Sequence, residues 1–417
     1  MRSDWNIAAG APRLSQRGAA CALIVVLCHA SCVLWAQVEL GTIDEPAAVI
    51  PDTGGPIEEI VLHFKAEMAL ELAPTYVDLF GALPPDVDFQ VICPSADDAE
   101  QFLACWGAEA SAGGRHVRVI DVDRPITIWA RDRRIVRQSV YSGVPTSTFV
   151  PASVPDYEED KLGELRLPRM LARHGLTPPV LEGVLHLEGG NIVSNHRHAF
   201  VGTNFFDENT GTIPDPSLLY RVLANLAGRE CLALSDEYGR VPWCHVDMYV
   251  TPVGENTVFV ASPIYARRLL TPDEFVADTD DVVEPALAVV QALSTGASTL
   301  DSIAGQLAEG GYRVLRLPAV IDPKQEWMIT YNNVLMEHRN GERVVYMPVY
   351  RVSVLDNAAE AAYRSLGFRL HRIDVSGIYE DGGAIRCLAN VSARRPVEAG
   401  TRRSQHEWPV GSAVQSD

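Results

Sequence analysis

The 417-residue chain lacks the excess of basic residues that nucleic-acid-binding proteins carry. It has 35 lysines and arginines against 54 aspartates and glutamates, a formal net charge of −19 at pH 7. Binding to nucleic acid or to an anionic membrane surface depends on basic side chains, so this balance argues against both partners. It favours a cationic small molecule or peptide as partner, although an acidic surface also serves solubility alone.

Cysteine is scarce, and no Cys-x-x-Cys spacing occurs, so a structural zinc site is not expected. Three of the eight cysteines precede residue 33, which leaves Cys93, Cys105, Cys231, Cys244 and Cys387. In an oxidising compartment an odd number implies a free thiol or an intermolecular bridge. Two disulfides with Cys387 free would suit a nucleophile, but the sequence does not assign the pairs.

Residues 18–36 form an uncharged run near the N-terminus that contains Ile24-Val25-Val26-Leu27. Arg2, Arg13 and Arg17 precede it, and the small residue Ala36 ends it. This pattern is typical of a secretory signal, and its length also suits an uncleaved membrane anchor. We therefore expect residues 1–40 to direct export to the periplasm, the medium or a membrane, with a cytoplasmic location left open.

The remaining chain predicts an α/β fold. Residues 41–57 are expected to be a linker, 58–392 a catalytic domain and 393–417 a polar tail. Local signals include a hairpin turn at Asn340-Gly341, a helix from Ser95 to about Cys105 and a mostly helical stretch over residues 271–293. Strand–strand–helix–strand units recur, and polar residues recur with them, since Asp132 to Glu188 is 56 positions and Glu188 to His245 is 57. This near-constant spacing predicts structural pseudo-repeats arranged around an axis, each of which places a polar side chain at a shared centre.

The pair Gly382-Gly383 lies shortly before Cys387 in the sequence, with Ala384-Ile385-Arg386 between them. Such a cysteine is a candidate nucleophile if a histidine and carboxylates converge on it, and otherwise a buried small apolar residue. His245 and Asp247 are expected on one face of a strand, where an imidazole could act as acid and base beside a carboxylate. A guanidinium suits this set, because paired carboxylates bind its N–H groups and a thiolate attacks its carbon.

Four motifs together resemble those of agmatine deiminases and bacterial peptidylarginine deiminases of the guanidino-group-modifying, or pentein, superfamily. They are Trp129-Ala130-Arg131-Asp132, Glu188-Gly189-Gly190-Asn191, His245-Val246-Asp247-Met248 and Gly382-Gly383-Ala384-Ile385-Arg386-Cys387. The resemblance covers about residues 58–392 and implies a five-bladed α/β propeller of ββαβ units. It also implies hydrolysis of a guanidino group to a ureido group plus ammonia, through a covalent thiouronium, without metal or cofactor.

The resemblance also implies roles for individual residues. Cys387 would be the nucleophile, His245 the acid and base, and Asp132 and Asp247 the carboxylates that bind the guanidinium. The residues implied to line the substrate site are Glu188, Asn191, Trp129, Asn333, Gly382 and Gly383. The substrate would be agmatine, arginine or an arginine-containing peptide.

The chain departs from the family pattern at several positions. Arg386 stands where the family has a histidine, Arg133-Arg134 stands where a Gly-Pro turn follows the first aspartate, and Leu388-Ala389-Asn390 lacks the usual threonine and glutamines. These departures allow a guanidino substrate other than agmatine. An amidinotransferase and a catalytically silent binding protein of the same fold remain alternatives. A papain-like protease is excluded by the order, because His245 precedes Cys387.

Overall fold

The computed structural model describes residues 46–152, 158–270, 296–324 and 326–396. The described residues form a mixed α/β fold, which confirms the predicted class. The expected signal or anchor (1–40) and most of the expected tail (393–417) lie outside these residues. Within them, no helix is long and apolar enough to cross a membrane.

Five sheets of three or four strands make up the described part of the chain. In order along each sheet, the strands of the first three sheets are β18 (Ala389–Arg394), β2 (Ile57–His63), β3 (Asp88–Cys93) and β4 (Val117–Asp121); β1 (Ala47–Val49), β5 (Ile135–Ser139), β6 (Pro145–Val150) and β7 (Val180–Glu182); and β10 (Glu230–Leu234), β9 (His198–Gly202) and β8 (Ile192–Ser194). The strands of the other two are β11 (Val250–Pro252), β12 (Thr257–Ser262), β13 (Arg313–Ile321) and β14 (Met328–Thr330); and β15 (Leu335–Arg339), β16 (Glu342–Val349) and β17 (Phe368–Asp374).

Each sheet contains the same pairing, an antiparallel pair that shares one strand with a parallel pair. Examples are β8–β9 antiparallel with β9–β10 parallel, and β15–β16 antiparallel with β16–β17 parallel. Parallel neighbours need a long crossover, which here contains a helix. One sheet joins the two ends of the described chain, because β18, the last strand, pairs with β2 near the start.

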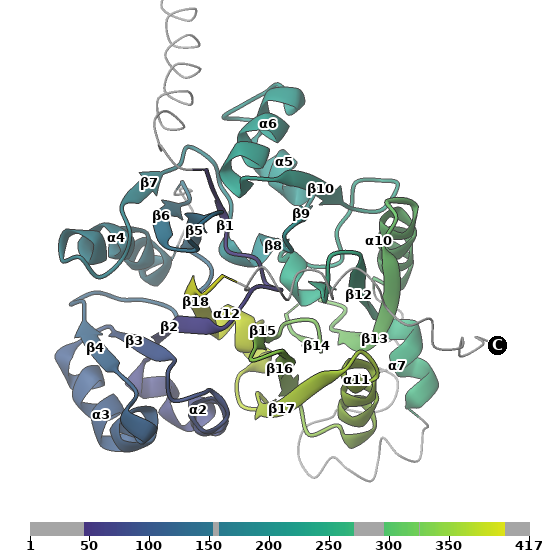
Figure 1. Ribbon diagram of the computed structural model, residues 1–417. Helices are drawn as coiled ribbons and strands as arrows, with labels where there is room; N and C mark the ends of the chain where they lie inside the picture. The colour runs from purple at the N-terminus through teal and green to yellow at the C-terminus, as the bar shows by residue number, and fades with distance from the viewer. Residues whose placement is uncertain (1–45, 153–157, 271–295, 325, 397–417) are drawn as a thin grey trace, which may run out of the picture. The chain divides into compact units, whose positions relative to one another are not determined.

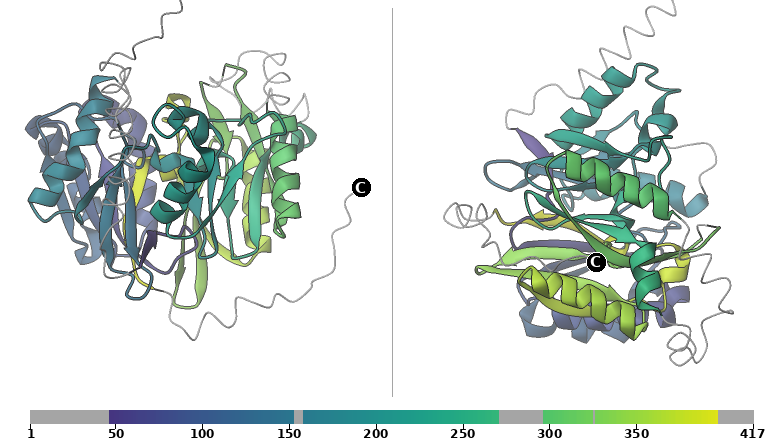
Figure 2. Two further views of the ribbon diagram at one scale, coloured as in Figure 1. Left: turned by 90° about the horizontal axis from the view of Figure 1, so that it is seen from above. Right: turned by 90° about the vertical axis from the view of Figure 1, so that its right-hand side faces the viewer.

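The helices vary from one turn to four. They are α2 (Ala69–Ala82), α3 (Ala96–Ala110), α4 (Glu159–Arg173), α5 (Asn204–Asn209), α6 (Pro216–Ala227), α7 (Pro263–Leu269), α10 (Ala297–Glu309), α11 (Ser353–Ser365) and α12 (Ile385–Leu388). Short 3₁₀ turns are η1 (Ala66–Met68), η2 (Ala112–Gly114), η3 (Gly189–Asn191), η4 (Val246–Met248) and η5 (Tyr379–Asp381). The longer helices lie on the outer side of the sheets, whereas α12 lies among them (Figure 1). Helices α10 and α11 pack against β13. Both helices lie on the side that faces the viewer in the right-hand view of Figure 2.

The largest core region lies under α2 and α3. In α2 the buried residues Leu72, Tyr76 and Leu79 recur at the spacing of one helix face. The Tyr76 ring contacts Phe102 and Trp106 of α3 with near-perpendicular ring planes. Full burial of such side chains contributes roughly 1.5–3 kcal/mol each, so this face fixes both helices against their sheet.

Local sequence signals are largely confirmed. The Ser95 side chain accepts a hydrogen bond from the Asp98 amide and caps α3, which runs beyond the expected end near Cys105. Asn340 and Gly341 take φ of 53° and 81° in the turn between β15 and β16, as a type I′ turn requires. The helix expected over 271–293 lies outside the described residues.

Two expectations differ from the structure. The five described cysteines are all free, so the two considered disulfides are absent among them. Residues 47–49, expected to belong to a linker, form β1 and pair with β5. Composition rich in proline and glycine indicates turns, but it does not reveal that a backbone segment adds a strand to a distant sheet.

Candidate active site

Short turns, not regular strands, deliver the predicted site residues to one cavity of about 500 Å³. Asp132 lies in the turn before β5, Glu188 precedes η3, His245 precedes η4 and Cys387 lies in α12. Six of the ten predicted site residues line the cavity: Trp129, Asp132, Glu188, His245, Gly382 and Cys387. Residues up to 258 positions apart therefore meet, as the sequence predicted.

Glycines permit this approach of segments. A Cβ on Gly190 would lie 2.4 Å from His245 Nδ1, and a Cβ on Gly383 would lie 2.7 Å from the Trp129 ring. Gly382 has φ of 87°, a conformation that side chains disfavour. Gly383 does not line the cavity, so its predicted substrate contact is replaced by a packing role beneath Trp129.

Cys387 is almost fully buried at 3% exposure. Its Sγ accepts a hydrogen bond from Asn333 Nδ2 at 3.1 Å, and Asn333 Oδ1 accepts from the Arg386 amide at 2.8 Å. Asn333 thus positions the first turn of α12 and does not line the cavity, and its contact with substrate stays a prediction. Burial, together with the Asp247 charge, raises the pKa of the Cys387 thiol to about 11.

His245 lies between two carboxylates. Its Nε2 is 2.5 Å from Glu188 Oε2, and its Nδ1 is 3.9 Å from Asp132 Oδ1. Burial favours the neutral ring, but the surrounding Cys244, Asp132, Cys387 and Glu188 outweigh it, so the pKa of His245 is raised well above its usual value. This shift favours the imidazolium form of the ring, which can donate a proton.

Glu188 balances this charge. Burial alone would raise the pKa of its carboxyl, but the hydrogen bond from His245 and the Arg133 guanidinium hold that pKa well below its usual range. Arg133 Nη1 donates to Glu188 Oε1. Glu188 is thus an ionised partner of His245 at the cavity wall, with both of its oxygens engaged.

Asp132 has a different environment. Burial raises the pKa of its carboxyl to about 7, with attraction to His245 opposing and repulsion from Glu188 adding to the shift. Its Oδ1 is buried and has no hydrogen-bond partner. An unpaired acceptor in a cavity is costly to the free protein and is suited to a cationic donor.

Asp247 is fully buried and does not line the cavity. Its Oδ2 accepts from Arg386 Nη1 at 2.7 Å, whereas its Oδ1 has no partner. Ligand atoms of Asp247, His245 and Cys387 all lie within 4.8 Å of one another. The predicted guanidinium-binding role of Asp247 is thus partly taken by an internal guanidinium, and one oxygen remains available beside the sulfur.

Two further predictions need correction. Asn191 is buried and its amide donates to Asn204 and accepts from the Gly202 amide, so it supports the loop and does not face the cavity. His245 and Asp247 do not share a strand face, because residues 246–248 form the 3₁₀ turn η4. That turn brings both side chains toward Cys387 by a different geometry from the predicted alternation.

Residues missed from the sequence include Arg386, Asp52 and Arg133. Arg386 is buried and binds Asp52 Oδ1 at 2.9 Å as well as Asp247. The replacement of the family histidine by Arg386 was the available signal, since a buried arginine requires acid partners. Nothing in the sequence indicated that Asp52, in the expected linker, would be one of them.

Two groups of side chains have ligand atoms close enough together to hold a metal ion: His245, Asp247 and Cys387, and Asp132, Glu188 and His245. The described residues fit this role poorly. Glu188 is engaged by Arg133 and His245, Asp247 is engaged by Arg386, and the raised pKa of His245 favours its protonated form. A metal ligand must be an unprotonated donor. The cluster suits a planar cation with N–H donors better.

No protein-family model and no curated protein matches this sequence. Solved structures do match its fold. An agmatine deiminase from C. jejuni aligns with a TM-score of 0.59 at 14% identity, covering 84% of this chain and 97% of that one. An agmatine deiminase of Enterococcus faecalis has a TM-score of 0.58 at 13% identity, covering 84% and 96%. A candidate peptidyl-arginine deiminase has a TM-score of 0.55 at 16% identity, covering 83% and 98%. The chain has the fold of these deiminases, which confirms the resemblance at the level of the fold.

Proposed function

We propose that this protein hydrolyses a guanidino group by way of Cys387. One observation carries the proposal: His245 joins two groups of ligand atoms, one with Asp247 and the Cys387 thiol and one with Asp132 and Glu188, and both Asp132 Oδ1 and Asp247 Oδ1 are buried without a hydrogen bond. A guanidinium offers planar N–H donors and a positive charge to such oxygens. Its central carbon would then lie beside the sulfur.

Substrate binding activates the nucleophile. The pKa of Cys387 is about 11 in the free protein, so the thiol is protonated at neutral pH. A bound cation next to the sulfur stabilises the thiolate, and the effect is strong in a desolvated cavity. The proton leaves to solvent, and the thiolate appears only when a guanidinium is present.

The first chemical step forms a C–S bond and breaks a C–N bond. The Cys387 thiolate attacks the guanidinium carbon, and the imidazolium of His245 gives its proton to the departing nitrogen. Ammonia leaves, a thiouronium cation remains on Cys387, and His245 is neutral.

The second step reverses the proton flow. Neutral His245 removes a proton from water as the oxygen attacks the thiouronium carbon, and the C–S bond then breaks to return the thiolate. Loss of one proton yields the ureido product, and that proton converts ammonia to ammonium. Glu188 keeps His245 oriented, and the proton taken from water leaves His245 as an imidazolium for the next turnover.

The substrate class proposed is agmatine, arginine or an arginine-containing peptide. The acidic chain and the carboxylates of the cavity support a cationic ligand. The structural neighbours include enzymes named as agmatine deiminases, and one of their structures holds a bound substrate. We further propose that the five sheets act as blades around the site, and that residues 1–40 direct export or membrane attachment.

The test uses the purified full chain with agmatine, free arginine and an arginine peptide, and measures both ammonia and ureido product. We expect one of the three to be turned over and Cys387→Ala to be inactive. Cys105→Ala, which changes an exposed cysteine of α3, is the matched control and should keep full activity. When the wild type is quenched with acid during turnover, intact-mass measurement should find a substrate-derived adduct that Cys387→Ala lacks. Turnover by Cys387→Ala would remove the mechanism.

A further inference from the structure

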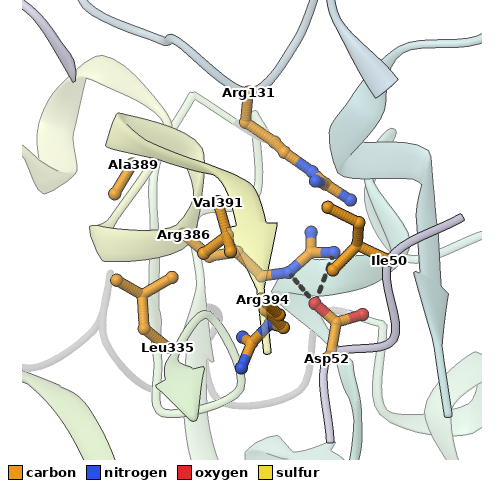
Figure 3. A pocket seen from close by; sticks show the side chains of 8 residues that line it. All are labelled: Ile50, Asp52, Arg131, Leu335, Arg386, Ala389, Val391 and Arg394. Carbon is orange, nitrogen blue, oxygen red and sulfur yellow. Dashed lines mark hydrogen bonds and ion pairs between the residues drawn. The ribbon is translucent and has the colours of Figure 1, made fainter. Parts of the chain in front are cut away.

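A second, smaller cavity of about 10 Å³ lies behind Arg386, on residues that the proposed reaction does not use directly. Three arginines and one carboxylate line it: Arg131, Arg386, Arg394 and Asp52 (Figure 3). They come from the turn before β5, from α12, from β18 and from the segment after β1. The rest of the wall is apolar, including Ile50 and Leu335.

The charges around this cavity do not balance. Arg386 is paired with both Asp52 and Asp247. Among the described residues, Arg131 and Arg394 form no ion pair. Arg131 donates hydrogen bonds to the carbonyls of Gly189 and Ile192, and Arg394 donates to the carbonyl of Gly55. Three guanidinium groups thus face two carboxylates. The charge of Glu337 also reaches Arg394, but Glu337 is itself paired with Arg339, so these buried groups together keep a surplus of one positive charge.

This surplus is buried and persistent. Arg131, Arg386 and Arg394 are 5%, 4% and 3% exposed. Burial lowers the pKa of Arg131 and of Arg394 to about 10 in each case, which leaves both charged at neutral pH. The Nε of Arg394 is buried and has no hydrogen-bond partner. An uncompensated buried charge is strongly destabilising unless an opposite charge accompanies it.

We propose that this cavity binds one monatomic anion, chloride or another halide, between Arg131, Arg386 and Arg394. A cavity of about 10 Å³ is near the smallest that holds a single water-sized particle, so phosphate, sulfate and carboxylates are too large. One negative charge cancels the surplus of one positive charge. The anion would lie next to the residue that precedes Cys387, and would keep Arg386 on Asp52 and Asp247.

The solution test measures thermal unfolding of the full chain in sodium gluconate, chloride and bromide at one ionic strength. We expect chloride and bromide to raise Tm saturably, by on the order of a few °C at about tenfold excess over Kd, because the ion binds only the folded state. Equal Tm values in gluconate and bromide would overturn the proposal.

Two variants separate this site from general salt effects. Arg394→Gln removes the surplus charge, so the halide-dependent rise in Tm should disappear. Arg395→Gln changes the neighbouring exposed arginine, which pairs with Glu58, and should keep the rise. A saturable rise that persists in Arg394→Gln would show that the ion binds elsewhere.

Crystals of the unaltered chain grown in bromide supply a second measurement that does not depend on any variant folding. Anomalous scattering should show one peak between the three guanidinium groups. A peak absent from this position, or density without anomalous signal, would mean that water fills the cavity. Both outcomes are independent of whether the protein hydrolyses guanidines.

Discussion

Asp132 allows a direct test of whether the site holds a carboxylate that is unfavourable until a cation binds. Asp132→Asn keeps the size of the side chain and removes its charge. Asp132 is 14% exposed, and its Oδ1 has no partner. The free protein should therefore gain stability from this change at neutral and alkaline pH, while losing affinity for a guanidinium.

The magnitude follows from the pKa of about 7 against the usual 3.8. This difference of about three units corresponds to about 4 kcal/mol, at 1.36 kcal/mol for each unit. Because the folded state binds the proton more tightly than the unfolded state, the wild-type free energy of unfolding falls as pH rises from 3.8 to about 7. Asp132→Asn lacks this contribution, so its advantage over wild type should grow by up to about 4 kcal/mol between pH 4 and pH 8.

The assay is urea unfolding of both proteins at pH 4, 6 and 8. Urea is required, since guanidinium chloride would supply the proposed ligand at molar concentration. A guanidinium compound at low millimolar concentration should stabilise the wild type and leave Asp132→Asn unchanged. If the difference between the two proteins is the same at all three pH values, Asp132 holds no costly buried charge and the reasoning fails.

Three other changes address the histidine and the buried arginine. Gly190→Ala puts a Cβ 2.4 Å from His245 Nδ1 and should lower turnover about 100-fold or more. A Cβ on Gly254 has nothing within 4 Å, so Gly254→Ala should keep its turnover. Equal losses in the two variants would contradict the steric argument. Glu188→Gln removes the charge hydrogen-bonded to His245, lowers the pKa of that ring, and should shift the alkaline limb of the pH–rate profile to lower pH; an unmoved limb would exclude His245 as the acid. Arg386→Gln leaves Asp52 and Asp247 buried without their cation and should reduce the free energy of unfolding by about 3–5 kcal/mol in urea, while exposed Arg395→Gln should stay within about 0.5 kcal/mol.

Much of the chemistry was readable from local sequence because it depends on residue type and order. A thiol, an imidazole and carboxylates in four recognisable motifs predicted the nucleophile and its partners, and the structure places Cys387, His245, Glu188 and Asp132 around one cavity. The turn at Asn340-Gly341 and the cap at Ser95 were predictable for the same reason, since backbone conformation and capping act within a few residues.

Membership of a site motif did not reveal which of the predicted residues line the cavity. Asn333, Asn191 and Gly383 belong to motifs beside the site but do not line the cavity. Asn333 is hydrogen-bonded to Cys387 and Arg386, Asn191 is hydrogen-bonded to Asn204, and Gly383 packs under Trp129. A motif covers the whole turn that carries a reactive group. Residue type alone does not tell the side chain that lines the cavity from the residues that hold the turn in place.

By itself the sequence determined the fold class, the repeating strand–strand–helix–strand order and the identity of the reactive groups, because hydrophobic pattern and side-chain chemistry are properties of local sequence. Only the tertiary structure decided how the charges are shared. Arg386 meets Asp52 across 334 positions and Asp247 across 139, and Arg131 and Arg394 line one cavity with Arg386 and Asp52. Burial removes the solvent that would otherwise screen these charges, so the pKa values and free carboxylate oxygens depend on which distant segments pack together.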